Sequence, residues 1–143
     1  MINAYETEDG VVFDMSQLEC DALRSYADGL LTDPEHPFVE LLRSQGLVVG
    51  DAPVPHLAAL LQAFSQATKV LTAWVVAPAG CRRSTFFVGP HSAAVLRCDD
   101  GGLYAGEDDP LTVWSIDAEQ LRETFLELSA LGEPSGEGIV ATA

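Results

Sequence analysis

Hydrophobic residues recur along this chain with two different periods, and the change of period divides it into helical and strand-like parts. After a short β-like start at Gly10–Phe13, apolar residues follow at three-to-four-residue spacing, which places them on one face of a helix. Ser16 and Glu19 form the pattern of a capping box at the start of the first helix. The stripes predict three helices over residues 16–28, 32–45 and 55–67.

From Lys69 onward the pattern is typical of strands. Val70–Val76 is rich in β-branched residues and apolar at both odd and even positions, which favours a strand covered on both faces. Asp99–Gly102 has the composition of a tight hairpin turn, because aspartate and glycine tolerate positive φ angles. Further strands are expected over residues 84–88, 93–97, 103–105 and 111–116. A closing amphipathic helix is predicted from Asp117 to Leu131.

Helices and strands thus come in blocks instead of alternating, which favours an α+β fold over a doubly wound parallel sheet. The expected architecture is an antiparallel sheet of about five to six strands packed with about four helices, in the order β-α-α-α-β-β-β-β-β-α. No repeat or long linker divides the 143 residues, so we expect one domain over residues 1–132. The Pro- and Gly-containing segment 133–143 is expected to be a disordered tail.

Charge is distributed unevenly along the chain. There are 22 acidic and 7 basic residues, a formal net charge of −15, yet no Asp or Glu occurs between Ala52 and Cys98. Because this segment lacks Asp and Glu, the commonest charged residues of the chain, we expect it to be mostly buried against protein. The acidic surface disfavours binding to nucleic acid and to anionic membranes, which leaves proteins as the expected partners. The first residues do not read as a signal peptide, so the cytoplasm is the expected location.

Motifs for catalysis or for a cofactor are not recognisable. The three cysteines are far apart and odd in number, which fits neither a disulfide framework nor a zinc site. The acidic loops lack the ligand spacing of an EF-hand, and no glycine pattern matches a nucleotide-binding loop. We therefore expect no metal, no cofactor and no enzymatic activity. The least implausible catalytic set is His91 with Cys98 or Cys81.

Two groups of residues are candidates for contacts with other proteins. Arg82 and Arg83 are the only adjacent basic pair and are expected on a turn, where a guanidinium suits a carboxylate of another chain. A strand with adjacent aromatics must bury both of its faces, and in a small domain self-association is one way to do so. The candidate dimer interface consists of Trp74, Phe86, Phe87 and Trp114.

Several segments resemble the EspG family, the cytosolic chaperones of type VII (ESX) secretion in actinobacteria. The resemblance extends over roughly residues 11–132. It rests on a helix ending in RSQGLV (43–48), an LAALLQAF helix (57–64) before a two-sided strand, the strand before Asp99-Asp100-Gly101, and the closing helix from Asp117.

The resemblance implies a function and a partly exposed sheet. EspG-type proteins consist of two similar halves around a pseudo-twofold axis and keep PE–PPE protein pairs soluble for export, whereas this chain looks like the first half alone. A symmetric homodimer would replace the second half. The family's partner-binding loop between the second and third strands corresponds here to the segment that contains Pro78, Gly80, Arg82 and Arg83.

The main hypothesis is thus a non-enzymatic EspG-like chaperone or adaptor of type VII secretion substrates that acts as a homodimer. One alternative is an acidic immunity or regulatory protein that neutralises a basic partner. Another is a small hydrolase using Cys98 or Cys81 with His91.

Overall fold

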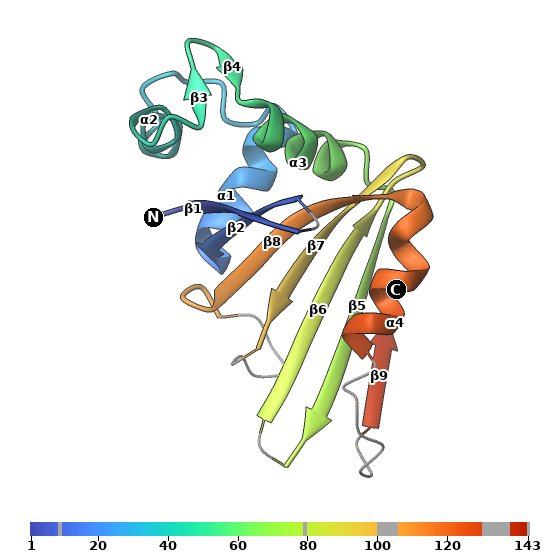
Figure 1. Ribbon diagram of the computed structural model, residues 1–143. Helices are drawn as coiled ribbons and strands as arrows, with labels where there is room; N and C mark the ends of the chain where they lie inside the picture. Colours follow the sequence, from blue (N-terminus) through green and yellow to red (C-terminus); the bar gives the residue numbers. More distant parts are fainter. Residues whose placement is uncertain (9, 79, 100–105, 130–137, 143) are drawn as a thin grey trace.

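The computed structural model describes residues 1–8, 10–78, 80–99, 106–129 and 138–142. Within these residues seven strands form one antiparallel sheet in the order β1-β2-β8-β7-β6-β5-β9 (Figure 1). The strands are β1 (Asn3–Thr7), β2 (Gly10–Ser16), β5 (Lys69–Ala77), β6 (Gly80–Val88), β7 (Ser92–Cys98), β8 (Pro110–Asp117) and β9 (Gly138–Thr142). A separate small pair joins β3 (Val48–Val49) and β4 (Ala52–Pro53). The predicted strand at residues 103–105 lies outside the described residues.

Four α-helices complete the described structure and confirm the α+β class. They are α1 (Gln17–Ala27), α2 (Pro37–Ser44), α3 (Pro55–Ser65) and α4 (Leu121–Ser129), the last preceded by the 3-10 turn η1 (Ala118–Gln120). The predicted start of the second helix at Thr32 is wrong. The helix begins at Pro37, because the His36 Nδ1 atom accepts the Phe38 N–H at 3.1 Å and so caps it.

The predicted capping residues lie where the helices begin. At α1 the Glu19 N–H donates to Ser16 Oγ at 3.1 Å, and the Ser16 N–H donates to Glu19 Oε1 at 3.0 Å. At η1 the Asp117 N–H donates to Gln120 Oε1 at 3.0 Å. These three hydrogen bonds satisfy backbone groups at helix starts, where no intrahelical partner is available.

The N-terminal strand β1 was not predicted. It pairs with β2 from Asn3↔Asp14 to Thr7↔Gly10, and all five of its residues are exposed. The preceding Ile2 is buried, and the Gln45 side chain holds its backbone: Oε1 accepts the Ile2 N–H at 3.2 Å, and Nε2 donates to the Ile2 carbonyl at 2.6 Å. A tertiary contact thus fixes a strand that has no hydrophobic face of its own.

The C-terminal prediction needs a correction. Residues 138–142, expected to be part of a disordered tail, form β9 and pair antiparallel with β5 from Val76↔Gly138 to Thr72↔Thr142. The free edge of β5 supplies backbone partners, which the composition of the segment does not reveal. Residues 133–137 and 143 lie outside the described residues.

The sheet has two faces that are covered differently. We call them the α3 face, which carries Phe87 and is covered by α1 and α3, and the α4 face, which carries Phe86. Phe87 meets Phe64 of α3 edge-on at a centroid distance of 5.4 Å, and Phe86 lies 5.7 Å from Phe125 of α4. In Figure 1, α4 lies over the β5 side of the sheet, away from β1 and β2. The α4 face is therefore only partly covered by helix.

Candidate functional site

The two arginines predicted on a turn lie inside strand β6. The turn is at Pro78 and Gly80, which are exposed and lie at the tip of the β5–β6 hairpin. Because side chains alternate along a strand, Arg82 and Arg83 point to opposite faces of the sheet. The prediction that both arginines lie on a turn is therefore wrong, because the strand already begins at Gly80. As a result, the two arginines contact different parts of the same chain.

Arg83 is buried on the α3 face, with 7% of the residue exposed. Its Nη2 atom lies 3.1 Å from Asp109 Oδ2, so its carboxylate partner belongs to the same chain. In this fold the Arg83 guanidinium is enclosed and paired within its own chain, which does not favour its predicted contact with a carboxylate of another protein. Arg82 is more exposed, and its Nε atom donates to Asp99 Oδ1 at 2.8 Å.

The aromatic residues proposed for a dimer interface also divide into two groups. Phe86 is 0% exposed and Phe87 is 6% exposed, and helices of the same chain enclose both rings. Both rings therefore belong to the core of the chain, which does not favour their predicted role in a dimer interface. Trp114 is half-buried and packs at the margin of the cluster around Phe86, while Trp74 is half-buried on β5 opposite Arg83.

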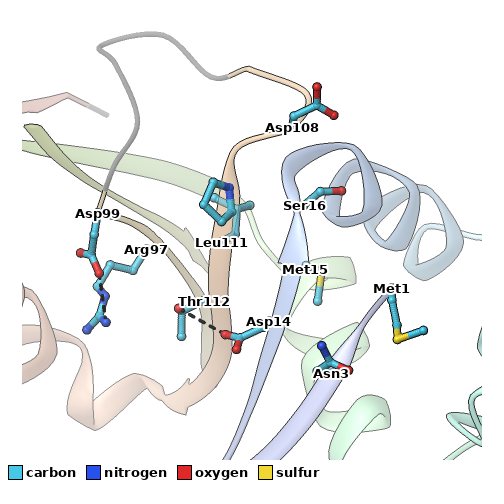
Figure 2. A pocket seen from close by; sticks show the side chains of 11 residues that line it. Met1, Asn3, Asp14, Met15, Ser16, Arg97, Asp99, Asp108, Leu111 and Thr112 are labelled. Atoms are coloured by element: carbon cyan, nitrogen blue, oxygen red, sulfur yellow. Dashed lines mark hydrogen bonds and ion pairs between the residues drawn. The ribbon is translucent and has the colours of Figure 1, made fainter.

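A groove opens on the uncovered part of the α4 face and has a volume of about 410 Å³. Cross-strand pairing sets one polar row across five strands, and its members on β1, β2, β8 and β7 line the groove. The row runs Asn3, Asp14, Thr112, Arg97 and Ser84. Figure 2 shows two pairs of side chains at the groove: Arg97 of β7 with Asp99, which follows β7, and Thr112 with Asp14. We call this site the polar groove.

Charges in the polar groove are arranged around two aspartates. Arg82 and Arg97 both contact Asp99, the latter at 3.3 Å between Nη2 and Oδ2, so one carboxylate serves two guanidiniums. The Arg97 Nε atom is buried and has no hydrogen-bond partner among the described residues. Because this atom is enclosed, a partner can reach only the exposed part of the Arg97 side chain, which is 33% of its surface.

The second aspartate, Asp14, accepts hydrogen bonds from two neighbouring strands. Its Oδ1 atom accepts from the Tyr5 hydroxyl at 3.3 Å and from the Thr112 hydroxyl at 3.5 Å. Burial and then the charge of Asp14 raise the pKa of Tyr5, which keeps the phenol protonated as a donor. Tyr5 is 43% exposed and lies beside the groove, where its ring remains accessible to a partner.

The loop of residues 106–109 connects the sheet to the first turn of α1. The Asp109 carboxylate accepts the Gly106 N–H at 2.9 Å in addition to Arg83. The carbonyls of Asp109 and Glu107 accept the Gln17 and Leu18 N–H groups at 2.9 and 3.0 Å. Two early N–H groups of α1 are thus satisfied by a loop that Asp109 itself organises.

This network predicts a dependence of stability on pH. The Gly106 N–H and then the Arg83 guanidinium lower the pKa of Asp109, so the ionised form is favoured in the folded state. The stabilisation is present above the pKa of an unfolded aspartate, about 4, and is lost as the pH falls through the lower folded value. We expect Asp109→Asn to lower the urea midpoint at pH 7, and the difference from wild type to vanish at about pH 2 to 3.

Asp108→Asn is the matched control for this prediction, because it changes an exposed neighbour and the net charge equally. Its urea midpoint should follow that of the wild type across the pH range. A difference between Asp109→Asn and wild type that is the same at every pH would contradict the proposed role of the Asp109 charge.

The structure separates the residues of the suggested hydrolase. His91 lies in the β6–β7 turn, whereas Cys98 ends β7 and Cys81 begins β6. The seven residues of β7 put His91 about 20 Å from either cysteine, at roughly 3.3 Å per residue. A thiol and an imidazole at opposite ends of a hairpin cannot act on one substrate atom, so this pairing is wrong.

Thiol reactivity gives a direct check of the cysteine environments. Burial raises the pKa of Cys20 to about 12, and Cys98 is 1% exposed, whereas Cys81 is half-buried. A thiolate is required for reaction with a disulfide reagent. In native protein at pH 8 we expect rapid labelling of Cys81 alone, and labelling of all three cysteines in urea. Rapid native labelling of Cys20 would contradict the described packing of α1.

Comparison with known proteins adds no relative to this description: no protein-family model and no curated protein matches the chain. None of the helices in the described ranges combines the length and hydropathy that crossing a bilayer requires. In the same ranges no three His, Cys, Asp or Glu side chains come together as metal ligands. Sequence reasoning missed the polar groove, because its residues come from separate strands and only the register brings them together.

Proposed function

We propose that this chain is a non-enzymatic protein-binding protein, an EspG-like chaperone or adaptor of type VII secretion substrates that acts as a cytoplasmic homodimer. The observation that carries the binding role is the open part of the α4 face, with the polar groove at its centre. Tyr, Trp and Arg are enriched at protein interfaces, and here Tyr5, Trp114 and Arg97 lie on this one face. The resemblance to the EspG family supplies the class of partner, PE–PPE-type substrates, for the same proposal.

The physical case rests on what the groove presents to a partner. Its floor is formed by strands, so the backbone that carries these side chains is already ordered before a partner binds. The Arg97 side chain is 33% exposed, and the Tyr5 residue beside the groove is 43% exposed. A partner segment with a carbonyl or carboxylate next to an apolar side chain would complement both groups.

Co-expression with candidate PE–PPE pairs, followed by affinity purification of the complex, tests this proposal. We expect a soluble complex with wild type, and binding at least about tenfold weaker for Arg97→Ala and for Tyr5→Ala, the usual effect of removing an interface hot spot. Arg122→Ala, which removes an exposed arginine of α4, is the matched control and should bind as wild type does.

Circular dichroism of each variant shows whether the fold is retained. Equal binding by Arg97→Ala and wild type would show that the partner does not bind at the polar groove. Failure of every candidate pair to form a complex would remove the chaperone role.

One observation favours the alternative of an immunity or regulatory protein with a basic partner. Three carboxylates, Asp14, Asp99 and Asp108, line the polar groove against a single arginine, in a chain of net charge −15. Such an interface is strongly screened by salt, whereas apolar docking is not. The test is the affinity for a basic partner protein at several salt concentrations. A steep fall in this affinity between low and physiological ionic strength would favour the alternative.

A further inference from the structure

The two edges of the described sheet differ in how they are protected against pairing with another chain. Strand β1 forms one edge, carries Glu6 and is followed by Glu8. Charged residues on an edge strand are a common device against edge-to-edge association. Strand β9 forms the other edge and reads Gly-Ile-Val-Ala-Thr, with no charge and no proline. Strand β9 itself therefore carries no such charge, and the nearest one in the sequence is Glu137, directly before it.

The distribution of carboxylates affects where a second copy of the chain can approach the sheet. Two copies of a chain with net charge −15 repel one another wherever their carboxylates meet. Strands β5, β6 and β7, which follow β9 across the sheet, lie in the segment without Asp or Glu. The strands on this side contribute no carboxylate toward a second copy, and among the described residues the nearest acidic side chains belong to α4, Glu123 and Glu127.

We propose that β9 pairs antiparallel with β9 of a second copy, so that the two sheets become one continuous sheet across a twofold axis. This inference rests on the homodimer of the proposed function and specifies its interface. Pairing of a strand with itself is isologous: it closes after two subunits and leaves only the two β1 edges, each protected by Glu6. Full overlap of Gly138–Thr142 sets Val140 opposite its own copy.

The position of β9 is compatible with the docking role of the polar groove. Figure 1 shows β9 as the outermost strand beside β5, whereas β1, β2 and β8, which contribute to the groove, lie on the other side of the sheet. A dimer through β9 leaves both grooves accessible and places them at the two distant ends of the combined sheet.

Disulfide trapping tests the pairing in the full-length chain. In a Cys81→Ser background we expect Val140→Cys to form a covalent dimer under mild oxidation, because the two residues face each other across the axis. Thr7→Cys on the β1 edge is the matched control and should remain monomeric on a non-reducing gel. Light scattering on the unoxidised proteins measures dimerisation independently. A dimer by light scattering without a Val140→Cys cross-link would overturn the β9 interface and leave the proposed homodimer intact.

A charge placed on the axis gives a second, reversible test. Val140→Glu sets two carboxylates opposite each other, whereas Val140→Gln has nearly the same shape without the charge. We expect the dimer dissociation constant of Val140→Glu to be at least about fivefold higher than that of Val140→Gln, and added salt to reduce the difference. Equal dissociation constants for the two variants would contradict the pairing. A monomer for wild type at all concentrations would exclude both this interface and the homodimer, while binding of a partner protein is tested separately by co-expression.

Discussion

Phe86→Ala is expected to lower the free energy of unfolding by about 3–5 kcal/mol, the range for removing a fully buried phenylalanine from a core. The ring is 0% exposed between the sheet and α4, where Val95 and Leu128 form the same cluster and the Phe125 ring lies 5.7 Å away. Its truncation leaves a cavity that the surrounding strands, held by their hydrogen bonds, cannot fill. Urea unfolding followed by circular dichroism measures the loss.

Leu126→Ala is the control for this variant, because it removes an apolar side chain from the same helix at a position that is 52% exposed. It should change the free energy of unfolding by less than about 0.5 kcal/mol. A loss below about 1 kcal/mol for Phe86→Ala would mean that α4 does not pack on the sheet as described.

Gly89→Ala is expected to be the next most destabilising change, with a loss of roughly 1–3 kcal/mol from overpacking. A Cβ atom at position 89 would lie 2.8 Å from the backbone oxygen of Gln66 and 3.2 Å from its carbonyl carbon. The clash is with main chain at the end of α3, so rotation of a side chain cannot relieve it. The β6–β7 turn must move away from α3, and the Gly89 N–H bond to the Ser92 carbonyl, 2.9 Å long, would be strained.

His91→Ala, two residues further along the same turn, is the matched control. The His91 side chain is exposed, and its backbone carbonyl, which accepts the Ala118 N–H at 2.9 Å, is unchanged by the substitution. Its effect should stay within about 0.5 kcal/mol. Equal thermal midpoints for Gly89→Ala and wild type would show that the turn has room for a side chain.

Local patterns predicted those parts of the fold that local interactions determine. The strand predicted over 111–116 implies opposite faces for neighbouring residues, and in the structure Val113 joins the core on the α3 face while Trp114 lies on the α4 face. The capping patterns at Ser16 and Asp117 also marked helix starts correctly. In these cases the residues that decide the structure are neighbours in the sequence.

Parts of the structure that depend on distant residues could not be predicted in this way. Strand β1 has no hydrophobic face, and the contact between Ile2 and Gln45 that anchors it spans 43 positions. Strand β9 forms because the edge of β5 is available to it, some 65 residues earlier in the chain. The polar groove depends on register, since Asp14 and Thr112 become neighbours only when β2 pairs with β8. Sequence spacing carries no information on any of these pairings.

The pairing of β2 with β8 has a consequence for the way in which the protein is made. The hydrogen bond between Asp14 and Thr112 joins residues 98 positions apart, and Phe13 and Met15 face Val113 and Leu111 in the same ladder. During synthesis the N-terminal hairpin leaves the ribosome long before its partner strand exists. This hairpin can therefore join the rest of the sheet only after translation of residues 110–117. Refolding in vitro should be slow for a chain of this size, as is usual where long-range strand pairs dominate.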